Sequence, residues 1–196
     1  VARIHSLRAC GINTTQLVRA TAAPTMAYGT EVMGMANLHL LNARRLCAKA
    51  VAPIGGGKAL DAILLGADGS AGTLDVAFSA HTLPLGTWAK AVWEKWQPVA
   101  ALNTALAHAQ NTVLASGDAS WAKVIGPAAA AVATANRIGW TFTSATHVRR
   151  THGPDLDLSC DPPCVVTAAV RHDVRQWRLN RISAKHGALV PASPDH

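Results

Sequence analysis

A run of apolar residues near the C-terminal end is the feature that most constrains how this chain can fold. Four of them recur at positions i, i+4, i+8 and i+11, which places them on one side of an α-helix: Val166, Val170, Val174 and Trp177. Asp161 and Pro162 provide a helix start, and Gly187 provides an end. Because a stripe of this kind is stable only when it packs against a core, the chain is expected to be a packed helical protein.

Further segments also have helical patterns. A helix over 14–27 must kink near Pro24, since proline removes a backbone donor. Asn37 is expected to cap a second helix that runs to Val51, and Pro53 with the glycines at 55–57 ends it. A third helix spans 87–115 with a kink at Pro98, and a fourth runs from Pro127 to Gly139. In the third helix, Trp88, Val92 and Trp96 are expected to share one face.

One small β-hairpin is expected between the last two helices. Residues 140–150 alternate and are rich in β-branched and aromatic side chains, turn residues follow at 151–155, and 156–159 form the returning strand. The predicted fold is therefore mainly α, with one hairpin beside the C-terminal helix. The predicted divisions are a helical segment over 1–53, a helical connector over 54–126, a helix, hairpin and basic helix over 127–188, and a loose tail over 189–196.

The charge of the chain favours a polyanionic partner. There are 18 Lys and Arg residues against 11 Asp and Glu, which gives a formal charge of +7, and the basic residues are concentrated towards the two ends. An ordinary solvated surface would give the same imbalance. The four cysteines are too scattered for a disulfide framework, and no apolar run approaches a membrane span. We therefore expect an intracellular protein of a reducing compartment, nuclear or cytoplasmic, that does not enter a membrane.

Two groups of basic residues are the candidate binding positions. They are expected to project beside the apolar stripes of their helices and to neutralise phosphates of RNA or DNA. The first group is Arg44, Arg45 and Lys49, and the second is Arg171, Arg175, Arg178 and Arg181. About six phosphate contacts from these helices predict a slope on the order of −5 in log K against log salt for duplex binding.

No motif predicts catalysis, a metal or a cofactor. The glycines at 55–57 and Lys58 lack the spacing and the hydroxyl residue of a phosphate-binding loop, and a flexible linker is the alternative interpretation. Cys160 and Cys164 lie near histidines, but with irregular spacing for zinc. Asp155 and Asp157 share one strand face without a third acid, whereas two-metal nucleotide chemistry needs clustered carboxylates.

One stretch resembles a known family. "RATAAPTMAYGTEVMGM", followed by a helix with "LLNARRLCAKAVAP", is similar to the segment that follows the polymerase motifs in reverse transcriptases of non-LTR retrotransposons, where "P-x-x-x-Y-G-x-E" begins the thumb. The matching residues are Pro24, Tyr28, Gly29 and Glu31, and then Arg44 and Arg45. The later stretches "GTLDVAFSAHTLPLGTWAKAVWEKW", "GPAAAAVATANRIGW" and "VRQWRLNRI" also resemble downstream parts of such proteins.

The resemblance implies a thumb-like segment over 1–53 that packs helices against a template–primer duplex of RNA or DNA. Because the chain begins with Val1, we expect a fragment of a longer polyprotein whose polymerase domain, with its catalytic aspartate pair, lies upstream. The implied role is to hold nucleic acid for an RNA-directed DNA polymerase without catalysis. The alternatives are a degenerate retroelement remnant with no activity and an RNase H-type hydrolase, which would need four clustered acids.

Overall fold

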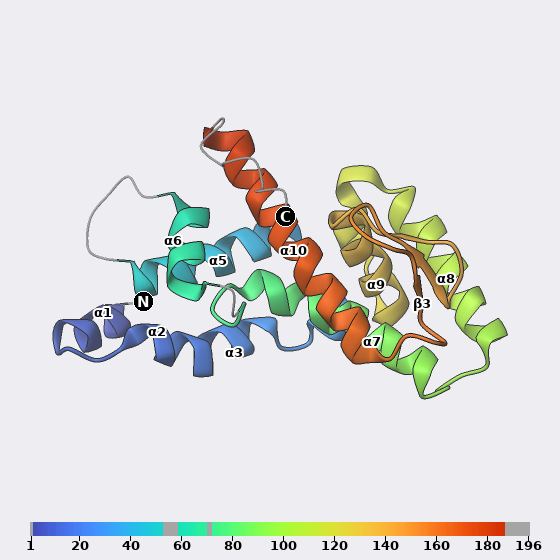
Figure 1. The fold of residues 1–196 in the computed structure, drawn as a ribbon, viewed down its shortest axis with the longest axis horizontal. Coiled ribbons are helices and arrows are strands. Elements are labelled where there is room, and N and C mark those ends of the chain that lie inside the picture. The colour runs from blue at the N-terminus through green and yellow to red at the C-terminus, as the bar shows by residue number, and fades with distance from the viewer. Residues whose placement is uncertain (1, 53–58, 70–71, 187–196) are drawn as a thin grey trace, which may run out of the picture.

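The computed structural model describes residues 2–52, 59–69 and 72–186, and these form a mainly helical molecule with one small sheet (Figure 1). The α-helices are α1 (Ala2–Ala9), α2 (Thr14–Leu17), α3 (Ala23–Ala27), α4 (Thr30–Met33), α5 (Asn37–Val51), α6 (Leu60–Asp68), α7 (Val76–Trp93), α8 (Val99–Leu114), α9 (Gly126–Arg137) and α10 (Pro163–His186). A π-helical turn covers Val18–Ala22, and a 3₁₀ helix covers Gly117–Lys123. The predicted fold class is confirmed. The predicted glycine linker at 55–57 and the tail at 189–196 lie outside the described residues.

Helix α7 is the centre of the molecule. It packs against α10, α9, α4 and α5, and Figure 1 shows α10 crossing it. Phe78, Leu85 and Trp88 of α7 are almost fully buried, and each contributes about 1.5–3 kcal/mol of hydrophobic stabilisation. This helix begins at Val76, inside the segment predicted as a helical connector, and its buried side chains belong to the main core.

The predicted helix over 87–115 is wrong in its continuity, because α7 ends at Trp93 and α8 begins anew at Val99. Lys95 adopts a left-handed backbone with φ of 55°, and the amide of Trp96 donates to the carbonyl of Ala91 at 3.0 Å. This terminating turn directs the backbone away from the helix. Trp96 is consequently half exposed and does not share the buried face of Trp88.

The predicted helix over 14–27 is interrupted by the π-helical turn at Val18–Ala22, which lies directly before α3. Pro24 lies in the first turn of α3, directly after the π-helical turn. Because Pro24 has no N–H to offer, the preceding backbone widens, and the amide of Ala23 donates to the carbonyl of Val18.

The C-terminal helix packs as its spacing predicts. Val166, Val170 and Val174 are at most 1% exposed, and they face α7 within the main core. The helix begins at Pro163 rather than at Pro162, while α9 ends where Gly139, with φ of 74°, was expected to stop it.

The single predicted hairpin is a three-stranded antiparallel meander. The strands are β1 (Thr141–Phe142), β2 (His147–Arg149) and β3 (Leu156–Asp157), in the order β1-β2-β3. The extra turn forms because the hydroxyl of Ser144 accepts the amide of His147 at 3.1 Å, which reverses the chain inside the segment expected to be one strand. Phe142, Val148 and Leu156 pair across the strands and cover the main core.

A second, smaller cluster of buried apolar residues joins the N-terminal helices to α5 and α6. It includes Val18, Cys47 and Leu64. Asn37 is the first residue of α5 rather than its cap, and the N-terminus of this helix has no side-chain cap. The end of α5 at Val51 agrees with the sequence prediction.

Candidate functional site

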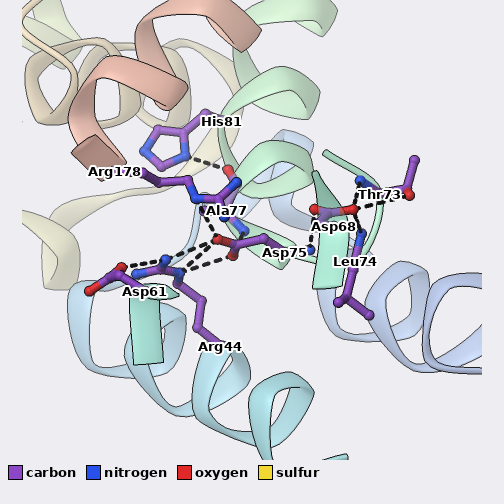
Figure 2. Close-up of polar contacts among 9 residues, drawn as sticks. All are labelled: Arg44, Asp61, Asp68, Thr73, Leu74, Asp75, Ala77, His81 and Arg178. Carbon is purple, nitrogen blue, oxygen red and sulfur yellow. Dashed lines mark hydrogen bonds and ion pairs between the residues drawn. The ribbon is translucent and has the colours of Figure 1, made fainter. Parts of the chain in front are cut away.

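Arg44 of α5 is the centre of a buried network of ion pairs (Figure 2). The residue is 1% exposed. Its Nε donates to Asp75 Oδ1 at 2.9 Å, and its Nη2 donates to Asp75 Oδ2 at 2.9 Å and to Asp61 Oδ1 at 2.7 Å. Burial alone would lower the pKa of Arg44, but the two carboxylates outweigh it and raise this pKa above its ordinary value.

Asp75 connects the start of α7 to both α5 and α10. Its Oδ1 accepts the amide of Ala77 at 3.0 Å, which caps α7, while the same carboxylate holds Arg44. Its Oδ2 lies 3.3 Å from Nε of Arg178 on α10. One side chain therefore fixes the relative positions of three helices.

Asp68, at the end of α6, organises the loop that leads to Asp75. Its Oδ1 accepts the amides of Thr73 and Leu74 at 3.0 Å each, and its Oδ2 accepts the amide of Asp75 at 3.0 Å. Arg19 approaches Asp68 Oδ1 at 3.7 Å. These hydrogen bonds satisfy three successive backbone amides next to the buried carboxylate.

Arg178 is inside the protein, so the expectation that it projects towards solvent with Arg171 and Arg175 is wrong. It is 1% exposed, and its guanidinium lies over the ring of Phe78 at 5.2 Å. The ion pair with Asp75 lacks hydrogen-bond geometry, and none of the three guanidinium nitrogens has a hydrogen-bond partner. Burial lowers the pKa of Arg178, which the charge of Asp75 partly opposes.

Arg44 was also expected to project from its helix, and it is buried instead. For both Arg44 and Arg178, the helical spacing to apolar neighbours indicated a buried position. Arg44 follows Leu40 by four positions and precedes Cys47 by three, so it belongs to the buried stripe of α5. Arg178 follows Val174 by four in the same way. Asp75, which the sequence interpretation missed, stands directly before an apolar run and so had the signal of a helix cap.

A second buried cluster holds another acid. Asp173 of α10 accepts Nε1 of Trp140 at 2.6 Å, and Arg150 donates to it through Nη2 at 3.0 Å and Nε at 3.1 Å. Together the two clusters take four carboxylates into the interior, which are Asp61, Asp68, Asp75 and Asp173. They also contain the guanidiniums of Arg44 and Arg178 and the nearly buried one of Arg150, and the guanidinium of Arg137 is desolvated at the end of α9. Among the described residues, the buried acids and buried arginines are therefore about equal in number, so the excess of basic charge belongs to the surface.

Four of the predicted binding residues remain near solvent. Arg45 and Lys49 are exposed on α5, Arg175 is exposed on α10, and Arg171 is half-buried there. Their contact with nucleic acid stays a prediction.

The seventh predicted residue, Arg181, lines a cavity of about 470 Å³ together with Arg44. This cavity lies between α5, α9 and α10, and Arg137 at the end of α9 is also part of its lining. The structure thus brings two predicted residues from distant helices to one place. Nothing in the sequence around Arg137 singled it out.

The four residues of the family motif lie in and after α3. Pro24 and Tyr28 are exposed, Tyr28 by 88%, and Glu31 is half-buried in the first turn of α4. Gly29 has φ of 79°, a left-handed backbone conformation that favours glycine. Tyr28 and Gly29 line a second cavity, of about 590 Å³, and Trp121 is also part of its lining.

The acids near the sheet have local partners. Asp157 lies 3.4 Å from Nε2 of His147, and hydrogen bonds from Ser159 lower the pKa of its carboxyl. Cys160 and Cys164 are exposed free thiols. Among residues 2–52, 59–69 and 72–186, no group of three or more His, Cys, Asp or Glu side chains is arranged to hold a metal ion.

Comparisons of this chain with protein-family models, with curated proteins and with solved structures found no match. In the described part of the chain, no helix has the length and apolar character needed to cross a bilayer.

Proposed function

We propose that this chain binds the phosphate backbone of a nucleic-acid duplex without catalysis, as the holding part of a reverse-transcriptase-like protein. The observation that carries this proposal is the separation of charge between the core and the surface. Four aspartates are buried among arginines, while Arg45, Lys49 and Arg175 stay exposed on α5 and α10. A surface left with a basic excess attracts a polyanion at long range.

The proposed contacts are sequence-tolerant. Arginine and lysine side chains that pair with phosphates position a protein on a duplex but read no base edges. The binding residues are Arg45 and Lys49 on α5 and Arg171 and Arg175 on α10. Non-specific binding of this kind has a Kd of roughly 10⁻⁴ to 10⁻⁶ M at physiological salt.

The proposal includes no catalysis because the buried acids already accept hydrogen bonds from an arginine or from backbone amides. Asp75 and Asp61 are both hydrogen-bonded to Arg44, and Asp68 accepts three backbone amides. Carboxylates committed in this way have few lone pairs left for two-metal nucleotide chemistry. A hydrolase of the RNase H type would need acids that these contacts do not occupy.

Fluorescence anisotropy with a labelled DNA duplex and a labelled RNA–DNA hybrid tests the proposal. The variant replaces the four proposed contacts with glutamine, at Arg45, Lys49, Arg171 and Arg175. We expect its affinity for both duplexes to fall at least about tenfold, because each lost contact releases one counterion fewer.

A charge-matched control separates a binding face from general attraction. It replaces four exposed basic residues elsewhere with glutamine, at Lys90, Lys95, Lys123 and Arg149. Equal weakening by the two variants would refute a face on α5 and α10. No measurable binding by the wild-type chain would favour the rival interpretation, a remnant whose basic residues only keep it soluble.

A further inference from the structure

The arginine-lined cavity between α5, α9 and α10 has the composition of an anion site. Its volume is about 470 Å³, within the range of small-molecule sites. The lining residues are Asn37, Leu38, Leu40, Leu41, Arg44, Arg137, Trp177 and Arg181. Three of these are cations and none is an acid.

Arg137 has no carboxylate partner within the part of the chain that the structure describes. Its Nε donates to Asn37 Oδ1 at 3.1 Å, and its Nη2 donates to the carbonyl of Met35. Its Nη1 is buried with no hydrogen-bond partner, and the guanidinium lies over the ring of Trp121 at 4.0 Å. Burial lowers the pKa of Arg137 to about 9, as expected of a desolvated cation that no carboxylate supports.

Arg181, which lines the cavity from α10, also has an unpartnered guanidinium nitrogen. Its Nε is buried without a hydrogen-bond partner, and its guanidinium lies 5.0 Å from the centre of the Trp177 ring. Among the described residues, no carboxylate forms an ion pair with Arg181 or with Arg137. Asp75 and Asp61 are already taken by Arg44. Among residues 2–52, 59–69 and 72–186, the cavity therefore has two positive charges that no carboxylate compensates.

The chemistry of the cavity selects a class of ligand. A phosphate monoester has a charge near −2 at neutral pH, which matches the two uncompensated guanidiniums, and guanidinium forks bind its oxygens well. The apolar wall of Leu38, Leu40 and Leu41 would suit the organic part of such a ligand. The N-terminus of α5, which has no side-chain cap, adds positive potential at the same place.

We propose that this cavity binds a small organic phosphate, with the phosphate between Arg137 and Arg181 and the organic part against Leu41 and Trp177. The site is separate from the four surface contacts of the duplex, so either proposal can fail without the other.

Thermal unfolding of the whole chain tests the site with four probes: adenosine monophosphate, inorganic phosphate, adenosine, and sodium chloride at matched ionic strength. At about 100 times its Kd, adenosine monophosphate should raise the Tm by about 5–10 °C. Inorganic phosphate should raise it less, and adenosine and chloride should leave it almost unchanged. A shift with adenosine equal to that with its monophosphate, or no shift beyond chloride with either phosphate, would overturn the proposal.

Single substitutions locate the effect. Arg181→Gln should weaken adenosine monophosphate at least about tenfold by calorimetric titration, since it removes half of the uncompensated charge. Arg149→Gln is the matched control, at an exposed arginine outside both the cavity lining and the proposed duplex contacts, and it should leave the affinity unchanged. Arg137→Gln should act like Arg181→Gln, and if it fails to fold, the comparison of the Arg181 and Arg149 variants still decides. Equal affinities for Arg181→Gln and Arg149→Gln would refute the assignment.

Discussion

Asp75→Asn is the substitution that most strongly tests the role of the buried network. Asparagine has nearly the same size and also caps helices well, so the start of α7 should be kept while the charge is removed. Arg44 would then retain Asp61 as its charged partner, whereas Arg178 would lose the only carboxylate within ion-pair distance among the described residues. Removing one partner of a buried ion pair costs about 3–5 kcal/mol, and we expect a loss of this size.

Urea unfolding measures the change as a difference in the free energy of unfolding. Asp155→Asn, at an exposed position, is the control and should stay within about 0.5 kcal/mol of the wild type. Adding Arg178→Met to Asp75→Asn removes the stranded cation and should recover about 2 kcal/mol, because the two sites are in contact. A loss below about 1 kcal/mol for Asp75→Asn, or no recovery in the double variant, would refute the reasoning.

Three further substitutions test other parts of the fold. Burial lowers the pKa of His81 to about 3 from 6.5. The stabilisation from the neutral ring is therefore present above pH 6.5 and is lost as the pH falls towards 3, by about 1.4 kcal/mol per pH unit. His81→Gln should flatten this decline in the free energy of unfolding, as measured by urea titrations. Gly139→Ala should cost about 2 kcal/mol, because φ is 74° and a Cβ would meet Thr151 Oγ1 at 2.5 Å; an unchanged Tm would contradict this. Trp88→Phe should cost about 2 kcal/mol, since it removes the hydrogen bond from Nε1 to the buried carbonyl of Ala145; a change below about 0.5 kcal/mol in urea unfolding would show that bond to be unimportant.

Periodicity and single turn residues predicted those parts of the fold, such as the buried face or the end of a helix, that depend on residues close in the sequence. The stripe of Val166, Val170 and Val174 fixed the buried face of α10, and Gly139 marked the end of α9. Turn chemistry was harder to read from the sequence. Lys95 ends α7 in a left-handed conformation that is uncommon for lysine, so no local pattern indicated that Trp96 would be exposed.

The candidate site was harder to predict, because burying an arginine requires an acid from a distant part of the chain. Arg44 is 31 positions before Asp75, and Arg178 is more than a hundred positions after it. The spacing of both arginines to apolar neighbours is that of a buried helix face. They were nevertheless expected at the surface, because charged residues are rarely buried without a partner. The cavity with Arg137 and Arg181 likewise depends on how α9 meets α10, which no single helix pattern contains.

The salt dependence of duplex affinity tests the proposed function most directly. From the sequence we predicted about six phosphate contacts and a slope of log K against log salt on the order of −5. Because Arg44 and Arg178 are buried, four phosphate contacts remain. Measured by anisotropy over a range of salt concentrations, the slope of log K against log salt should be about −4 for the wild type and close to zero when Arg45, Lys49, Arg171 and Arg175 are glutamine. A wild-type slope near zero, or a slope that this fourfold substitution leaves unchanged, would contradict the proposal that these residues hold the duplex.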